Sequence, residues 1–206
     1  MALVLVVAVL GLAVGLLAGG RLDALGTLPI RLGPALPVGL GVQVAALLLE
    51  PWSRVLAALG YALAAALVAT FAAANLTLPG VPLMGLGLVL NAVVVLANGV
   101  AMPVSIAAAA RAGISHEDLR IEDDPLHIEA TDGTRLRALG DSIAVPLPVR
   151  PQVVSPGDVL LAAGVGLFLC IGTLRPRRQD GIAQPPSRDA RSSTRASDST
   201  TRGSYS

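Results

Sequence analysis

Charged, aromatic and sulfur-containing side chains are scarce in this sequence. Lysine is absent, although there are fifteen arginines, so a Gly-x-x-x-x-Gly-Lys phosphate-binding loop cannot occur. The single cysteine, Cys170, excludes an intrachain disulfide and any metal site built from several cysteines. Charged residues make up 14% of the chain and the net charge is +1, which argues against a nucleic-acid partner.

Long apolar stretches are the most prominent feature of the sequence. Hydrophobic residues make up 53% of the chain, and about twenty consecutive apolar residues are enough to cross a bilayer as a helix. The sequence therefore predicts an all-α integral membrane protein with about five transmembrane helices in a bundle, surrounded by the lipid bilayer of the cell membrane. The predicted spans are 1–20, 32–49, 53–74, 81–100 and 156–174.

Two of these stretches have alternatives. Residues 1–20 lack the basic start of a secretory signal and are long for its apolar core, which favours a retained span. The stretch 32–49 begins irregularly at Gly33, Pro34 and Pro37. The alternative for it is a segment lying in the membrane interface, which would leave four spans.

The last span has a well-defined start. Ser155 is a typical N-cap, Pro156 suits the first helical position, and Asp158 can complete a capping box. No charged residue follows until Arg175, so the run from its first turn onward is long enough to cross a bilayer.

Small and polar residues within the spans predict helix contacts. Gly11, Gly15 and Gly19 share one helical face, which favours close approach of another helix. Asn91 and Asn98 lie seven residues apart on one face, and Gln43 lies in the second span. Interhelical hydrogen bonds are the favoured interpretation, and a polar path through the membrane is the alternative.

The polar loop 101–155 is predicted to hold a short helix and a small β-hairpin. Ser105 can cap a helix that continues to about Arg111 and ends at Gly113. The stretches 126–130 and 135–139 flank Asp132-Gly133, a typical two-residue turn, and so predict the hairpin. The stretch 143–154 contains three prolines and is therefore predicted to be extended.

Two groups in this loop could carry chemistry. His116, His127 and the acidic run 122–124 are ordinary metal-ligand types, but their spacing matches no compact site, so a solvated acidic loop is favoured and no metal or cofactor is predicted. Asp141 is the best candidate for a functional carboxylate near the bilayer. The alternative is a turn whose side chain binds backbone amides.

The orientation follows from arginine placement. Arg175, Arg177 and Arg178 directly follow the last span, which predicts a cytoplasmic C-terminus and an extracytoplasmic loop 101–155. The segment 175–206 is rich in Ser, Thr, Arg and Pro, and is predicted to be a disordered cytoplasmic tail.

The order of these features resembles a known family. The segments GGRLDAL, LNAVVVLANGVAMPVS and TRLRALGDSIAVPLPVRPQVVSPGDVLLAAGVGLFL are similar to bacterial membrane proteins grouped as domain-of-unknown-function family 5317. The resemblance covers residues 1–174 and is most specific over 98–105 and 139–161. It implies a small multi-span membrane protein and no assigned activity.

Three functions remain as hypotheses. The first is a non-catalytic role in which the bundle holds the loop for contact with another membrane or envelope protein. The alternative is a small transporter or channel component with a path lined by Asn91, Asn98 and Gln43. A membrane enzyme using Asp141 and a loop histidine on a lipid-linked substrate is the third, although no Gly-x-Ser-x-Gly nucleophile motif occurs.

Overall fold

The computed structural model describes residues 2–49, 53–119, 121, 124, 126–148 and 150–175. The predicted tail therefore lies outside the described residues from position 176 onward, as do Glu122 and Asp123 of the acidic run. The side chain of His116 is likewise outside the described part of the chain.

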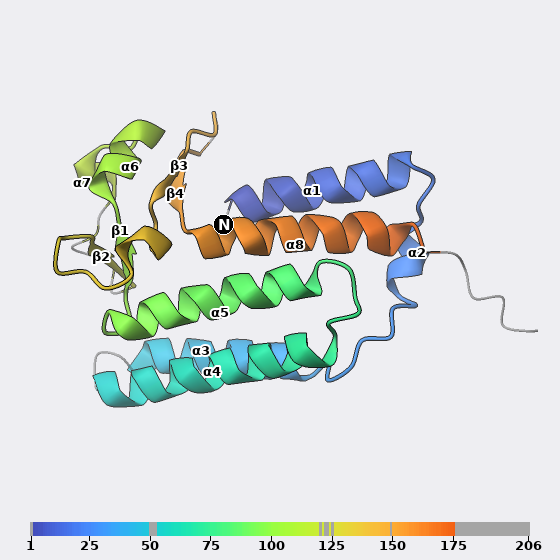
Figure 1. Ribbon diagram of the computed structural model, residues 1–206, viewed down its shortest axis with the longest axis horizontal. Coiled ribbons are helices and arrows are strands. Elements are labelled where there is room, and N and C mark those ends of the chain that lie inside the picture. Colours follow the sequence, from blue (N-terminus) through green and yellow to red (C-terminus); the bar gives the residue numbers. More distant parts are fainter. Residues whose placement is uncertain are drawn as a thin grey trace, which may run out of the picture. The chain divides into compact units, whose positions relative to one another are not determined.

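The described chain is mostly helical, and each of the five apolar stretches contains a helix (Figure 1). These five helices are α1 (Ala2–Leu17), α3 (Ala35–Leu49), α4 (Arg54–Ala74), α5 (Val81–Ala97) and α8 (Pro156–Thr173). A short helix, α2 (Leu22–Leu25), lies between α1 and α3 along the chain.

Two of the five, α4 and α8, are long and apolar enough to cross a membrane. The helices α1, α3 and α5 contain 16, 15 and 17 residues, and at 1.5 Å per residue each is shorter than the hydrocarbon core. The helices α1 and α5 end before the predicted spans 1–20 and 81–100 do, for local reasons. Gly19 and Gly99 take positive φ angles of 90° and 75°, which an α-helix does not accommodate.

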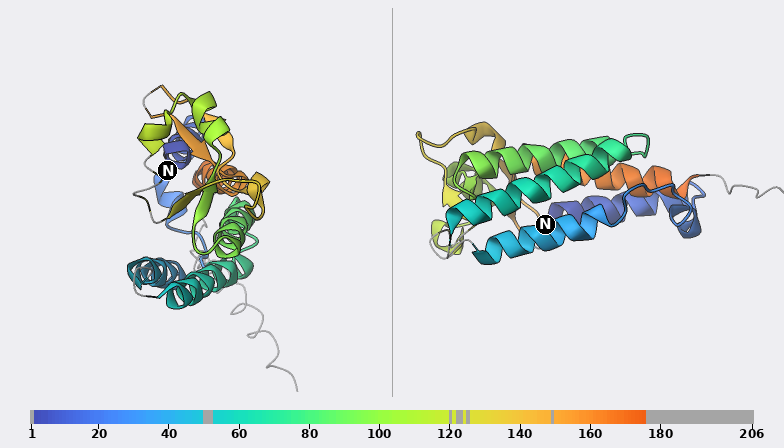
Figure 2. Two further views of the ribbon diagram at one scale, coloured as in Figure 1. Left: turned by 90° about the vertical axis from the view of Figure 1, so that its left-hand side faces the viewer. Right: turned by 90° about the horizontal axis from the view of Figure 1, so that it is seen from below.

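Helix α8 lies between α1 and α5, while α4 packs against α3 and α5 (Figures 1 and 2). Glycines allow close approach on both sides of α8. A Cβ atom on Gly11 would come within 2.7 Å of the Gly166 Cα, and one on Gly157 within 2.6 Å of the Gly87 carbonyl oxygen. Side chains at these positions would force the helices apart.

The predicted glycine row of α1 is only partly used in this packing. Gly15 approaches the Cys170 carbonyl oxygen of α8, where a Cβ atom would lie 2.8 Å away, in the same way as Gly11 approaches Gly166. Gly19 has already left the helix, and no atom lies within 4 Å of where its Cβ would be.

The polar region after α5 combines short helices and strands. The helix α6 (Ile106–Ala112) is capped by Ser105, whose hydroxyl accepts from the Ala108 N–H, and Gly113 follows it with a φ of 84°. The helix α7 covers His116–Leu119. The strand β1 (Met102–Val104) pairs in parallel with β2 (His127–Glu129), and β3 (Ile143–Val145) pairs in antiparallel fashion with β4 (Gln152–Val154).

The hairpin predicted over 126–130 and 135–139 is wrong. Its first half forms β2, but the partner of β2 is β1, and residues Arg137–Leu139 form a 3-10 turn. The Asn98 side chain explains why the second half does not pair, because its amide accepts from the Arg135 N–H and donates to the Arg135 carbonyl oxygen. The hairpin in this region is instead β3–β4, within the stretch predicted to be extended.

Candidate functional site

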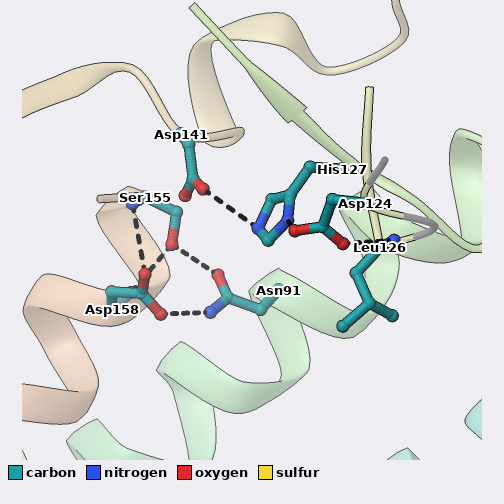
Figure 3. Close-up of polar contacts among 7 residues, drawn as sticks. All are labelled: Asn91, Asp124, Leu126, His127, Asp141, Ser155 and Asp158. Atoms are coloured by element: carbon teal, nitrogen blue, oxygen red, sulfur yellow. Dashed lines mark hydrogen bonds and ion pairs between the residues drawn. The ribbon is translucent and has the colours of Figure 1, made fainter. Parts of the chain in front are cut away.

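The site begins where α5 crosses the start of α8. Gly87 and Gly157 bring the two helices close together at this point, and Asn91 lies one turn further along α5. Its side chain reaches α8, where Nδ2 donates to the Asp158 carboxylate over 2.7 Å. The Ser155 hydroxyl in turn donates to Oδ1 of Asn91 over 2.8 Å (Figure 3).

These contacts surround the cap of α8. The Asp158 N–H donates to the Ser155 hydroxyl over 2.9 Å, and the Ser155 N–H points back to the Asp158 carboxylate over 3.4 Å. The structure thus contains a capping box, with Asn91 attached to both of its side chains. Asn91 makes an interhelical hydrogen bond, and Asp158 uses both of its oxygens.

Asp141 is held rigidly by its backbone. Its N–H donates to the Pro103 carbonyl oxygen and its own carbonyl accepts from the Ser105 N–H, both over 2.8 Å. A Cβ atom on Gly140 would lie 2.6 Å from the same Pro103 oxygen, so the chain here lies directly against β1. Asp141 itself is only 8% exposed. In the turn alternative its carboxylate would accept from backbone amides, but no described residue donates to its buried Oδ1 atom.

His127 links Asp141 to a second carboxylate (Figure 3). Its Nδ1 atom lies 2.7 Å from Asp124, whose other oxygen accepts from the Leu126 N–H over 2.9 Å. Its Nε2 atom faces the Asp141 carboxylate at 3.8 Å. This distance is within reach of an ion pair and too long for a hydrogen bond.

The surroundings move the pKa values of the two carboxyls in opposite directions. Burial, together with the negative charge of Asp158, raises the pKa of Asp141 to about 7, although His127 acts against this. Burial also acts to raise the pKa of Asp124, but the hydrogen bonds from Leu126 and His127 and the charge of His127 outweigh it. The pKa of Asp124 is therefore below its usual value.

Two cavities meet at Asp141 and His127. The first, which we call the bundle cavity, has a volume of about 390 Å³ and extends between α4, α5 and α8. The second, the loop cavity, has a volume of about 680 Å³ and is bounded by the polar region, including Asp118, Asp124 and Arg150. Asp141 and His127 line both cavities.

The structure brings most of the predicted polar residues together. Gln43, Asn91, Asp141 and Asp158 all line the bundle cavity, where Tyr61 and His127 join them. Asn98 does not, because it ends α5 and binds the Arg135 backbone. Among the described residues there is no group of three or more histidine, cysteine or acidic side chains placed to hold a metal ion.

The sequence suggested a loop histidine as a partner of Asp141 but did not distinguish His127 from His116. His127 and Asp141 come from β2 and from the turn before β3, and the parallel β1–β2 pairing that brings them together has no local signature. Tyr61 was missed as a cavity residue. Its position on the same α4 face as Ala65 and Val68, three to four residues apart, is the signal that could have found it.

Comparison with known proteins assigns the family. A model described as "Family of unknown function (DUF5317)" matches residues 27–170. The chain belongs to this family. The matched range includes every residue named above as lining the bundle cavity.

The family gives no activity. An uncharacterised protein of Thermotoga maritima is 32% identical over 139 residues, which is 67% of this chain and 74% of that protein. No solved structure matches. The resemblance found in the sequence is thus confirmed for the family, and function has to be argued from the site.

Proposed function

We propose that this chain is a non-catalytic, multi-span integral membrane protein that holds a small water-soluble solute in the bundle cavity, as a component of a transport path. The observation that carries the proposal is the composition of that cavity. Polar side chains from α3, α4, α5, α8 and the loop converge on one space of about 390 Å³, within helices that are otherwise apolar. Ligand sites of this size are typically apolar with a few convergent polar groups.

Outward-facing side chains support the membrane setting. Large apolar residues are exposed along the helices, among them Leu10 at 57%, Leu40 at 62% and Leu59 at 62%. Exposed apolar surface of this extent marks an interaction site on a water-soluble protein, whereas a lipid environment accounts for it directly. The close glycine contacts of α8 are also typical of helices packed in a bilayer.

The directions of the helices support five spans. Helices α3 and α4 are antiparallel, because Gly39 meets Val68 and Gly60 meets Ala46. Helices α5 and α8 are antiparallel as well, since Gly87 meets Gly157 and Gly80 meets Gly164, whereas α1 runs parallel to α8. A chain that crosses five times alternates in this way. The proposed arrangement has the C-terminus in the cytoplasm and loop 101–155 outside.

The short helices are compatible with crossing. A helix of 15 to 17 residues is accommodated by local thinning of the bilayer at modest energetic cost. Segment 32–49 is included as a span because α3 packs along α4, one of the two helices long enough to cross.

Cysteine accessibility tests the proposal in the membrane. In a Cys170→Ala background, Ala92→Cys places a thiol on the wall of the bundle cavity, while Val93→Cys places one on the neighbouring, 47% exposed face of α5 that lines none of the described cavities. We expect N-ethylmaleimide to modify the Ala92→Cys protein many-fold faster in native membranes, because only a hydrated thiol ionises and reacts.

The two positions control for each other, being adjacent on the same helix. Equal, rapid modification at both would mean that α5 is not surrounded by lipid. Slow modification at both would mean that the cavity holds no water, and the proposed function would then be wrong.

A further inference from the structure

The wall of the bundle cavity is acidic. Among its described lining residues are two carboxylates, Asp141 and Asp158, and one histidine, His127, but no arginine. The chain has no lysine to supply a positive charge elsewhere in the wall. An uncompensated carboxylate next to a low-dielectric wall attracts a cation.

Of the two carboxylates, only Asp141 is available to a ligand. Asp158 accepts hydrogen bonds from Asn91 and from the Ser155 N–H. The Oδ1 atom of Asp141 is fully buried and has no hydrogen-bond partner among the described residues. Leaving a buried acceptor without a donor is unfavourable, and more so when the acceptor is charged, so the folded protein gains stability when a donor binds there.

His127 presents a second acceptor next to the carboxylate of Asp141, on the side of its Oδ2 atom. The Nδ1 atom must carry a hydrogen, because its partner at 2.7 Å is the Asp124 carboxylate, which only accepts when ionised. In the neutral ring, Nε2 then carries the lone pair and faces the Oδ2 atom of Asp141 across 3.8 Å, while the unpartnered Oδ1 is the other oxygen of the same carboxylate. Two acceptors cannot form a hydrogen bond with each other. At this separation, a group with several N–H donors can contact both of them.

We propose that the bundle cavity binds a small protonated amine, whose N–H groups donate to the Asp141 carboxylate and to Nε2 of His127. This inference rests on the proposed function and names its solute class. An ammonium group has three donors and no acceptor, which matches an anionic oxygen beside an imidazole nitrogen. Alkali and alkaline-earth ions prefer oxygen ligands, so the imidazole favours the amine.

Methylammonium chloride is a suitable probe, with tetramethylammonium chloride as its matched control. Both are monovalent cations, but the second has no N–H donor. The full-length protein is purified in detergent at pH 8, above the pKa of Asp141 of about 7, and its thermal unfolding is followed at constant ionic strength. We expect a saturable rise of the midpoint with methylammonium and none with tetramethylammonium.

Two variants locate the effect. Asp141→Asn keeps the shape of the side chain but removes the charge, and is expected to weaken the apparent affinity for methylammonium roughly tenfold or more, as loss of a charge-assisted hydrogen bond does. Asp132→Asn removes an exposed carboxylate whose partner is Arg137, outside the bundle cavity, and should leave the affinity unchanged.

Each contrary outcome would overturn a defined part of the proposal. Equal stabilisation by both ammonium salts, or stabilisation by potassium chloride alone, would show that the site does not recognise N–H donors. An absent methylammonium effect with a reactive Ala92→Cys thiol would refute the amine and leave the hydrated cavity standing. An unreactive Ala92→Cys thiol would refute the cavity itself.

Discussion

Asp141 is the residue on which the proposed site depends, because its carboxylate is buried there. It is fixed by two backbone hydrogen bonds and faces His127, and Asp158 of α8 lies near enough to affect its pKa. No feature of Leu139-Gly140-Asp141-Ser142 on its own distinguishes a functional carboxylate from an ordinary turn. The distinction comes from β1, which binds the Asp141 backbone and leaves the side chain directed at His127.

The raised pKa of Asp141 predicts how stability depends on pH. The folded protein retains the proton up to about pH 7, whereas the unfolded chain releases it near the ordinary pKa of 3.8. Between these values the folded state binds more protons, so the free energy of unfolding falls as pH rises and levels off above pH 7. The difference is at most about 4 kcal/mol, at 1.36 kcal/mol per pKa unit.

Unfolding of the detergent-solubilised protein at pH 5 and pH 8 measures this contribution. Asp141→Asn should remove it, so that the loss of stability toward pH 8 becomes smaller than in the unaltered protein. Asp132→Asn is the exposed control. The titratable groups around Asp141 are His127, Asp158 and Asp124, and the lowered pKa of Asp124 acts only in more acidic solution. A variant with the full original slope would assign the pH dependence to another group.

Two asparagines show what residue type alone can and cannot predict. Asn91 and Asn98 are seven residues apart on one apolar helix, and both were expected to face a neighbour. Asn91 binds the start of α8, while Asn98 ends α5 and binds the Arg135 backbone. Helix periodicity places both on one face, but it does not tell where along that face the helix ends.

At the scale of elements, the crossing of α5 and α8 positions the site. Gly87→Ala would place a Cβ atom 2.8 Å from the Leu161 N atom and close to the Gly157 carbonyl oxygen. Backbone atoms cannot yield as a flexible side chain does, so the helices must separate. We expect the free energy of unfolding to fall by about 1–3 kcal/mol.

Gly41→Ala is the matched control, measured in the same unfolding assay. Gly41 lies within α3, and a Cβ atom added to it would have no neighbour within 4 Å, so alanine should be neutral or stabilise the helix by up to about 1 kcal/mol. If both alanine variants behave alike, the close crossing does not limit stability.

Helices were predictable from the sequence, whereas strand pairing was not. Apolar stretches and caps such as Ser105 and Ser155 are local signals, and all of the long helices occur where these signals are. The parallel pairing of β1 with β2 joins Met102 to His127, although the helices α6 and α7 lie between them along the chain. Asp132-Gly133 favoured a local hairpin. The side-chain amide of Asn98, which is distant in sequence, instead forms hydrogen bonds with the Arg135 backbone.

For the molecule as a whole, the proposed five crossings predict which parts of the chain are outside the cell. An alkaline phosphatase fusion at Thr131 should be active, because this enzyme folds only after export, and a fusion after Arg178 should be inactive. Green fluorescent protein at the same two positions should give the opposite pattern. Activity at both positions, or protein that stays soluble after membranes are removed, would contradict the five-span arrangement.

The role predicted first from the sequence, in which the polar region 101–155 contacts another membrane or envelope protein, stays a hypothesis. That role is compatible with a solute site, because the loop cavity and the bundle cavity share only part of the wall formed by this region. Crosslinking through the loop in intact cells tests it, and the absence of any partner above background would count against it.

The central place of α8 has a consequence for biogenesis. Of the five apolar helices, α1 is synthesised before the others and α8 after them, so α1 finds its packing partner, and α5 its second one beside α4, only when α8 has been made. Until then, the glycine-lined surfaces of α1 and α5 that α8 covers lack this partner, and the helix cap that binds Asn91 does not exist. The bundle cavity is therefore completed only when α8 packs between α1 and α5.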